Sequence, residues 1–358
     1  MIPPISPAKK RSRVTASKQT HETNETNETN ETNETNETKG NDKSIIGYLL
    51  FKKVVIEGAN AISSPLTYGF PAVTGFLGSF HVMSRKMAEH DELKQLSLGG
   101  VLLACYECTP HVYRDQPYSN YTFNQSRNPI KKDGKTASII EEGKCRLVMS
   151  FVVEVLADSK PASDRIDSLK VQSLQWIQQQ RLAGGSVFGV DRVTPVQFFA
   201  RDDVDAVVPH LLPAFVLMEA KQDFSEIIDA VQTDHPDATP LDVLIDVCAL
   251  HHIPETKASG ETKWSTMSRK SGHGWLVPMP IGYQGISDVF DAGIMQNVRN
   301  PKYPSQYVEA VYSLGKWVYP QRLGINSEYD LTTAFWRYHY DAADQLYLVT
   351  QSSSSLPI

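Results

Sequence analysis

Alternating apolar and polar positions predict a strand at residues 145–155. Arg146, Ser150 and Glu154 fall on one face of this segment, together with two valines. The other face carries six apolar side chains: Cys145, Leu147, Met149, Phe151, Val153 and Val155. A period of two is typical of a strand with one buried and one solvated face. We therefore expect a half-buried strand here.

Weaker patterns predict the elements around this strand. Apolar, β-branched-rich runs at 48–58, 101–106 and 186–200 predict three further strands. A helix is predicted over 71–87, because Pro71 is favoured in a first helical turn. A second helix is predicted over 163–182. Its apolar stripe consists of Ile166, Leu169, Leu174 and Ile177.

The order of these elements is βαβ, a hairpin, and βαβ again. This order is the split βαβ, or ferredoxin-like, arrangement of an α+β protein, and its open sheet is also the scaffold of the RNA-recognition module, or RRM. We expect three regions: a tail at 1–43, an RRM-like core at 44–200 with an inserted thumb hairpin at about 112–140, and a helical C-terminal α/β elaboration at 201–358.

The region beyond residue 200 has weaker signals. Short amphipathic segments at 224–231 and 241–250 predict two helices, and the polar run 255–274 predicts a mobile loop. The apolar stretch 274–280 contains Pro278 and Pro280, which confine it to a sheet edge or to an extended packing strip. We expect this stretch to belong to the core more than to a ligand site.

The N-terminal region is of low complexity. From Glu22 the triplet Glu-Thr-Asn repeats five times, and such a composition, without apolar residues, predicts a disordered extension. A short basic run precedes the repeat at Lys9–Arg13. This run is either a nucleic-acid arm or nuclear signal, or a solvated segment without a partner.

Charge is divided unevenly along the chain. The formal net charge is −6 and the pI is about 5.9, which excludes a protein that coats nucleic acid indiscriminately. Residues 202–261 have a net charge of −11 and residues 1–43 have none, so the remainder is net +5. We expect the acidic segment to face a basic protein neighbour or to keep the molecule soluble, and the basic part to bind an anion.

The strongest candidate site is the basic hairpin. It places four cationic side chains within nine residues: Arg127, Lys131, Lys132 and Lys135. Asn128-Pro129 and Asp133-Gly134 are turn signals, so the cations would project from a tight loop onto a phosphate backbone. The alternative is a solvated hairpin without a partner.

Other candidates for RNA contact are weaker. Arg85 could reach either a carboxylate or a phosphate. Gly184, Gly185 and the adjacent Ser186 form either the C-cap of the second helix or a backbone that lets RNA approach closely.

Catalytic and metal patterns are weak in this sequence. Cys105-x-x-Cys108 and Cys248-x-x-His251 could close a zinc site, but Cys105 and Cys248 lie in apolar runs typical of a core. His81 and His111 are the most plausible acid/base residues for RNA cleavage. We interpret His81 as a packing residue of the first helix. We expect no catalytic residue, metal or other cofactor.

Eight collinear motifs resemble the Csy-two subunit of type I-F CRISPR surveillance complexes, a Cas-five-like family, over residues 54–340. They are Asn60-Ala-Ile-Ser-Ser-Pro-Leu-Thr67, Gly69-Phe-Pro71, the glycine-spaced helix through His81, Arg127-Asn-Pro-Ile, Asp133-Gly134, Ile140-Glu-Glu-Gly143, Leu182-Ala-Gly-Gly-Ser186 and Gly274-Trp-Leu-Val-Pro-Met-Pro-Ile-Gly-Tyr283. The Glu-Thr-Asn repeat and Cys108 have no counterpart in that family.

The resemblance implies a non-catalytic antiviral subunit. Such a subunit holds the 5′ handle of the guide RNA (crRNA) with the large subunit, abuts the backbone filament, and has target DNA nearby in the complex. Handle contacts are then expected at Asn60, Ser63, Ser64, Arg85 and Arg181–Ser186, and phosphate contacts at the hairpin with Asn128. The alternatives are a repeat-processing endoribonuclease of the Cas-five type and an adaptor that touches only protein. No apolar run is long enough to span a membrane, so we expect a cytoplasmic protein. The type I-F resemblance implies that it comes from a bacterium or from a phage that carries such a system.

Overall fold

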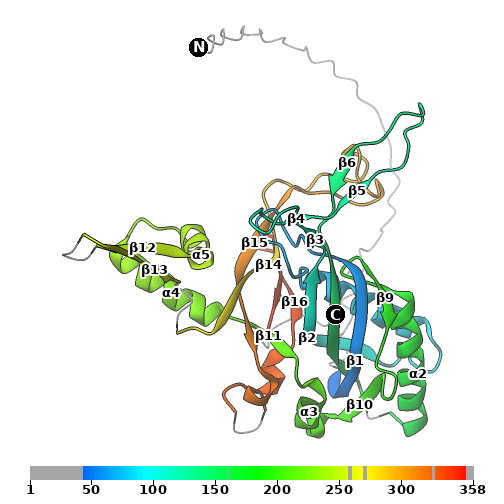
Figure 1. Ribbon diagram of the computed structural model, residues 1–358. Coiled ribbons are helices and arrows are strands. Elements are labelled where there is room, and N and C mark those ends of the chain that lie inside the picture. The colour runs from blue at the N-terminus through cyan, green and yellow to red at the C-terminus, as the bar shows by residue number, and fades with distance from the viewer. Residues whose placement is uncertain (1–42, 160, 257–259, 269–271, 325–326, 352–358) are drawn as a thin grey trace, which may run out of the picture. The chain divides into compact units, whose positions relative to one another are not determined.

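A computed structural model describes residues 43–159, 161–256, 260–268, 272–324 and 327–351, all within the compact unit Asn41–Ile358. The tail predicted at 1–43 therefore lies, except for Lys43, outside the described residues. The described chain is a mixed α/β structure with five α-helices and one large antiparallel sheet (Figure 1). None of its described helices combines the length and hydropathy that a membrane crossing requires.

The sheet has eleven strands, of which ten lie in the order β16-β17-β14-β15-β11-β2-β7-β1-β9-β8, and β10 pairs separately with β1. Every pairing is antiparallel. The bounds are β1 Ser44–Asn60, β2 Ser97–Pro110, β7 Lys144–Ala157, β8 Arg181–Leu182, β9 Gly185–Gly189, β10 Val196–Ala200, β11 Phe215–Glu219, β14 Trp275–Gly285, β15 Val308–Val318, β16 Arg337–Asp341 and β17 Leu346–Thr350.

Helices α1 (Thr74–Glu89) and α2 (Ser163–Gln179) cover one face of the β2–β7–β1 part of the sheet. The six predicted apolar side chains of β7 are all fully buried on this face, and Phe151 packs against Phe76 and Phe80 of α1. The prediction for this face of the strand is confirmed.

The opposite face of β7 is also covered from Ser150 to Glu154, so the expectation of a half-buried strand holds only for residues 144–149, where buried and partly exposed positions alternate. Short helical segments after residue 200 pack there: η1 (Arg201–Val207), α3 (Val208–Leu211) and η3 (Leu331–Ala334). Buried Glu154 is satisfied on this face, because Gly100 N donates to its Oε2 across 2.7 Å and Arg337 pairs with its Oε1. The polar residues that suggested a solvated face are held by partners distant in sequence.

Two predicted elements near residue 190 are corrected. The strand expected at 186–200 is two strands, β9 and β10, because Asp191 Oδ1 accepts hydrogen bonds from Val193 N and Thr194 N in an intervening turn. Helix α2 ends at Gln179, so Gly184-Gly185 is not its C-cap. Ala183 (φ 47°) and Gly184 (φ 82°) instead form the two-residue turn of the β8–β9 hairpin.

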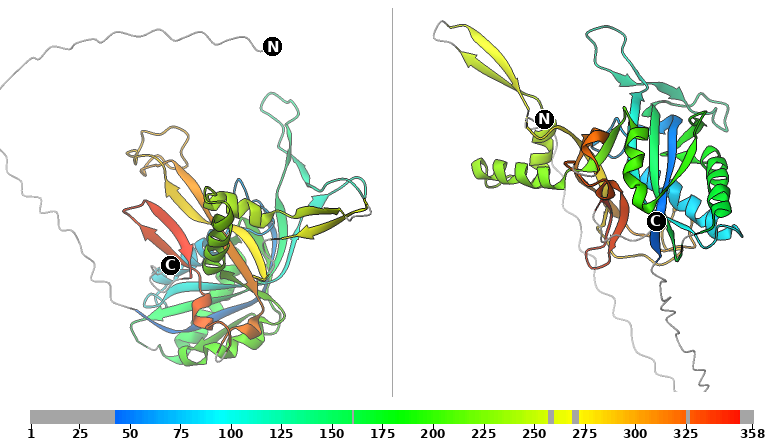
Figure 2. Two further views of the ribbon diagram at one scale, coloured as in Figure 1. Left: turned by 90° about the vertical axis from the view of Figure 1, so that its left-hand side faces the viewer. Right: turned by 90° about the horizontal axis from the view of Figure 1, so that it is seen from below.

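The C-terminal region adds helices α4 (Lys221–Asp234) and α5 (Pro240–Cys248), as predicted. The loop expected at 255–274 is wrong, because β12 (His251–Thr256) and β13 (Thr262–Met267) form a hairpin, which projects away from the central sheet in the right-hand view of Figure 2. Its side chains are mostly exposed, so no burial period marked it in the sequence.

The sheet-edge position predicted from the two prolines is found in only one half of strand β14. Pro278 and Pro280 pair with β15 on one side, and β17 joins the other side of β14 only at residues 282–284. The half that contains the prolines therefore has one unpaired edge, as expected, while the other half is interior to the sheet. The remaining described elements are β3 (Val112–Tyr113), β4 (Thr122–Phe123), β5 (Gln125–Arg127), β6 (Ile139–Glu141) and η2 (Pro320–Arg322).

Candidate nucleic-acid interface

Four strand ends meet at one end of the central sheet. Asn60, the last residue of β1, pairs with Lys144, the first of β7, and Pro110, the last of β2, pairs with Cys145. Strand β9 begins beside them, where Ser186 pairs with Glu57. Residues 111–143 connect β2 to β7 and therefore leave and re-enter the sheet here. We call this the hairpin end.

The loop after β1 and the β8–β9 turn are joined at the hairpin end. Asn60 N donates a hydrogen bond to Ala183 O across 2.9 Å, and Ala61 N donates to Gly143 O across 2.8 Å. Asn60 Nδ2 donates to Ile62 O across 2.8 Å, which closes the start of the loop. Three segments that are distant in sequence, each carrying a predicted site residue or motif, are therefore in direct contact.

The two glycines of the β8–β9 turn have different environments. A Cβ at Gly185 would lie 2.7 Å from both Ala59 N and Ile56 Cγ2, so glycine is needed there for packing on β1. Gly184 has a positive φ and is exposed, and a Cβ there would meet only Asn60 Cβ at 3.9 Å. Gly184 therefore leaves backbone open to a ligand, whereas Gly185 does not.

The predicted serines are already engaged within their loop. Ser63 Oγ and Ser64 Oγ each lie 2.7 Å from Thr67 Oγ1, and Thr67 N donates to Ser64 Oγ across 3.0 Å. Thr67 is itself buried. These hydroxyls set the shape of the loop, so a ligand that bound them would share them with these contacts.

The basic hairpin is formed by β5 and β6, which pair through residues 125–127 and 139–141. Gly134 N donates to Lys131 O across 2.9 Å with Gly134 at φ 75°, and Lys135 N donates to Asp133 Oδ1 across 3.1 Å. The turn predicted from Asp133-Gly134 is confirmed. The cations project from an ordered turn.

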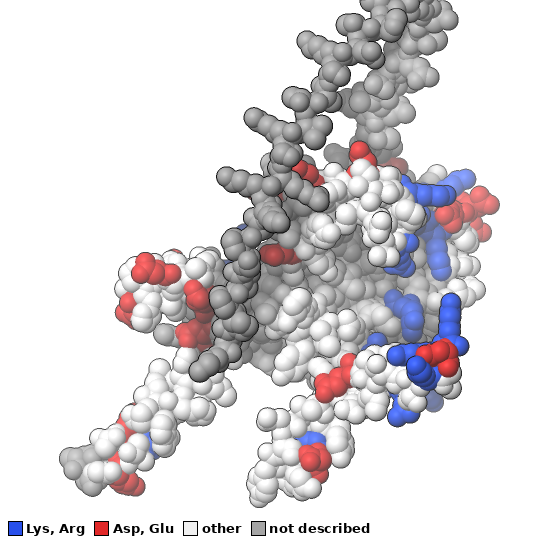
Figure 3. Space-filling view, turned by 90° about the horizontal axis from the view of Figure 1, so that it is seen from above, with Lys and Arg blue, Asp and Glu red and all other residues white. Residues whose placement is uncertain are grey.

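The four hairpin cations, with Asn128, are all solvent-exposed. Lys135 Nζ lies 3.6 Å from Asp133 Oδ2 in an exposed pair that solvent screens. Among the described residues, no acidic side chain pairs with Arg127, Lys131 or Lys132. Lys and Arg gather on the right-hand side in Figure 3, the side of this hairpin in Figure 1, whereas Asp and Glu dominate the left-hand part, the side of α4 and α5.

The arginines predicted elsewhere lie at opposite ends of the core. Arg181 is exposed in β8, opposite Ser186, at the hairpin end. Arg85 is eleven residues into α1, about 16 Å along its axis, next to Ser84, whose Oγ accepts from Leu98 N near the start of β2. Arg85 is therefore not brought together with the other predicted residues.

Arg146 is a charged residue of this end that the sequence did not single out. Its Nε lies 2.8 Å from Glu57 Oε1 and its Nη1 lies 2.6 Å from Glu107 Oε2. The hydrogen bond with Arg146 lowers the pKa of Glu107, and the hydrogen bond with Glu107 raises that of Arg146. This guanidinium offsets one of the two negative charges that would repel a phosphate.

An aromatic cavity next to the hairpin end was also missed. Its volume is about 490 Å³, and Trp275 lies at its wall with 57% of its surface exposed. The core expectation for residues 274–280 holds for Leu276 and Met279, which are buried, but is wrong for Trp275. No local pattern could reveal this cavity, because its walls come from five segments distant in sequence.

The structure also places the histidine and cysteine candidates. His81 is exposed on α1, so its interpretation as a packing residue is wrong, and His111 N donates to Lys144 O at the hairpin end. Burial raises the pKa of Cys105 to about 12. Over the described ranges, no group of three or more His, Cys, Asp or Glu side chains is arranged to hold a metal ion.

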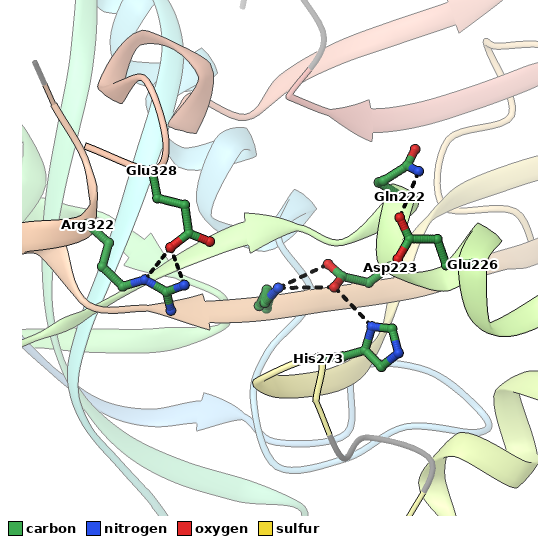
Figure 4. A network of polar contacts seen from close by, with 7 residues as sticks. Gln222, Asp223, Glu226, His273, Arg322 and Glu328 are labelled. Carbon is green, nitrogen blue, oxygen red and sulfur yellow. Dashed lines mark hydrogen bonds and ion pairs between the residues drawn. The ribbon is translucent and has the colours of Figure 1, made fainter. Parts of the chain in front are cut away.

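A polar cluster joins the C-terminal helices to the sheet (Figure 4). Lys316 Nζ of β15 lies 3.0 and 3.2 Å from the two carboxylate oxygens of Asp223 on α4, and His273 Nδ1 lies 3.3 Å from Asp223 Oδ1. Burial by itself would lower the pKa of Lys316, but the hydrogen bond and charge of Asp223 outweigh it, so this pKa is raised. This ion pair fixes α4 to β15.

Comparisons with known proteins define the class of this chain. Residues 49–349 match the family model described as "CRISPR-associated protein (Cas_Csy2)". The chain is 30% identical over 322 residues to the CRISPR-associated protein Csy2 of Pseudomonas aeruginosa (strain UCBPP-PA14), with 84% of this chain and 93% of that protein covered. It is therefore a CRISPR-associated protein. The chain belongs to the Csy2 (Csy-two) family of type I-F complex subunits, and the resemblance found in the sequence motifs is confirmed.

Proposed function

We propose that this protein is the guide-RNA-binding subunit of a type I-F CRISPR surveillance complex and that it holds the crRNA 5′ handle at the hairpin end without cutting it. The observation that carries the proposal is that the insertion bearing the exposed basic hairpin is fixed at its base, Gly143, to the loop after β1, which in turn contacts the β8–β9 turn. Exposed cations beside open backbone suit a phosphate backbone.

The roles follow from the contacts. Arg127, Lys131, Lys132 and Lys135 neutralise phosphates, with Asn128 as a polar contact beside them. Arg181 adds a cation from β8, and the exposed backbone at Gly184 admits a close approach. Asn60, Ser63, Ser64, Gly185 and Ser186 shape the surface that the handle contacts. Arg85 is left out of this set, because it lies near the start of β2.

The proposal also covers the fold of the core and the protein partners of the chain. A ferredoxin-like core is supported by the order β2-β7-β1-β9 in an antiparallel sheet with α1 and α2 on one face. The acidic segment 202–261 is proposed to face protein neighbours, namely the large subunit and the adjacent backbone-filament subunit, with target DNA nearby. Its net charge of −11 would repel nucleic acid.

One experiment separates this function from its rivals. The purified full chain, alone and with its large-subunit partner, is incubated with labelled repeat RNA. Binding without cleavage is the expected result. Cleavage by the wild-type chain would establish the alternative of a processing endoribonuclease, and neither binding nor cleavage in both preparations would indicate an adaptor that touches only protein.

A further inference from the structure

The aromatic cavity lies between the loop after β1 and the strands β2, β11, β14 and β15. Six aromatic residues line it: Tyr68, Phe70, Tyr106, Phe215, Trp275 and Trp317. Two pairs of these rings contact edge to face, with ring centroids 5.1 Å apart for Phe70–Trp317 and 5.4 Å apart for Phe215–Trp275. These contacts hold the rings in fixed orientations around a space of about 490 Å³, within the range of small-ligand pockets.

Three of these rings are open to solvent. The exposed fractions are 77% for Tyr68, 57% for Trp275 and 36% for Phe215. Phe70 and Trp317 pack against the core and form the inner part of the wall. A group of exposed aromatic faces around a preformed cavity is a feature of binding sites, because burial of these faces is favourable.

The cavity is continuous with the proposed RNA surface. Tyr68 contacts Phe123 of β4 edge to face, with centroids 5.8 Å apart, and β4 belongs to the 111–143 segment that carries the four hairpin cations. Ser63 also lines the cavity. Glu107 is the one acidic residue among its lining residues, and Arg146 and Thr109 already bond its carboxylate. One aromatic residue of the cavity wall, Tyr68, is therefore in direct contact with the insertion that carries the hairpin cations.

We propose that this cavity takes one unstacked nucleobase of the RNA whose phosphates lie on the hairpin cations, an inference that rests on the proposed function. Cations for the backbone combined with aromatic faces for bases are what single-stranded RNA binding requires. An apolar side chain of a protein partner would also fit an aromatic cavity. The nucleobase is favoured because Tyr68 of the cavity wall contacts Phe123 of the basic insertion, whereas none of the lining residues comes from the acidic helices α4 and α5.

The test is a double-mutant cycle between protein and RNA. The full chain is titrated with the labelled repeat-derived guide RNA of its own locus and with RNAs that are abasic at single handle positions. The protein variants are Trp275→Ala, the conservative Trp275→Phe, and the control Trp264→Ala. Trp264 lies in β13, has a similar exposure of 64%, and does not line the cavity. Thermal melting shows that each variant is folded.

We expect Trp275→Ala to weaken binding about 5- to 150-fold, the loss that alanine substitution of one stacking aromatic produces. Removal of the base at one handle position should weaken binding to the wild type by a similar factor. The same abasic RNA should show no further loss of affinity for Trp275→Ala. Trp275→Phe should restore most of the affinity, and Trp264→Ala should leave it unchanged.

Failure of this inference can be told from failure of the proposed function. The cavity holds no base, and the RNA-binding function stands, in either of two outcomes. In the first, changing Lys131, Lys132 and Lys135 together to Ala weakens RNA binding but Trp275→Ala does not. In the second, each abasic RNA loses as much affinity for Trp275→Ala as it loses for the wild type. Loss of a protein partner from Trp275→Ala with RNA binding intact would overturn the inference in favour of a protein side chain. If the wild type binds no RNA, both proposals fail.

Discussion

The backbone amide of Asn60 donates a hydrogen bond to the carbonyl oxygen of Ala183 across 2.9 Å. This bond connects two of the family motifs, which are more than a hundred residues apart in the chain. Because Ala61 N also bonds Gly143 O, the base of the hairpin insertion is fixed to the same two loops. The candidate interface is thus held by main-chain contacts, and its exposed side chains can be changed with little cost to the fold.

Removal of the hairpin cations should change the salt dependence of RNA binding. In a variant with Lys131, Lys132 and Lys135 all changed to Ala, each lost phosphate contact should reduce the slope of log K against log salt by about 0.7–0.9. Fluorescence titrations at several salt concentrations measure this slope. A matched triple variant of exposed lysines elsewhere, Lys94, Lys221 and Lys263, should leave the slope unchanged. An unchanged slope in the folded hairpin variant would contradict the assignment.

Gly185→Ala should destabilise the chain. A Cβ there would lie 2.7 Å from Ala59 N, so the β8–β9 hairpin must shift on β1 at a cost of about 1–3 kcal/mol. The control is Gly189→Ala, because that Cβ would meet nothing within 4 Å and Gly189 has no positive φ. Urea unfolding compares the two. Equal stabilities would show that the contact at Gly185 is accommodated without cost.

The Asp223–Lys316 pair should stabilise the fold up to strongly alkaline pH. Lys316 has only 13% of its side chain exposed, so Asp223→Asn should reduce the free energy of unfolding by about 1.5–3 kcal/mol. Because the folded pKa of Lys316 is raised above its ordinary 10.5, this contribution is complete below pH 10.5 and is lost as the pH rises through the raised value. Denaturant unfolding of the wild type and of Asp223→Asn, at pH values below and above 10.5, tests the direction of this pH dependence. A difference that grows above pH 10.5 would refute it.

His81→Ala should change neither RNA processing nor stability. The imidazole is exposed on α1, and its removal leaves no cavity. RNA cleavage in a reconstituted system and the melting temperature are the two measurements. The prediction is contradicted if the wild-type chain alone cleaves repeat RNA without metal and the folded His81→Ala variant does not.

Sequence reasoning succeeded where structure is local. The buried face of β7 followed from a period of two, and the turn at Asp133-Gly134 followed from the φ > 0 that Gly supplies. It failed where distant segments meet. Glu154 was predicted to be solvated, because the sequence of the strand gives no sign that Arg337, far along the chain, pairs with this carboxylate. The cavity around Trp275 was missed for the same reason, since Phe215 and Trp317 come from other strands.

The N-terminal extension should be dispensable for folding and assembly. Residues 1–43 have no net charge and no apolar periodicity, so their deletion removes nothing that a core or a charged interface requires. Circular dichroism of the 44–358 chain at a concentration too low for aggregation, and its co-purification with the large subunit, check the two parts of this prediction. Loss of assembly with an intact fold would assign a partner to the basic run at Lys9–Arg13.

The last prediction concerns the protein-facing half. In the lone 44–358 chain, three large apolar side chains of α5 and β13 are exposed within the acidic region or next to it: Leu241, Ile245 and Met267. Exposed apolar surface of this kind promotes association, and a partner that buries it stabilises the folded chain. We expect the lone chain to aggregate and co-expression with the large subunit to yield a monodisperse complex on size-exclusion chromatography. Ile245→Glu should improve the solubility of the lone chain and weaken the complex, whereas the same change at exposed Val171 on α2 should do neither. A monodisperse, thermally stable lone chain that gains nothing from the large subunit would show that this acidic half is a solvated surface.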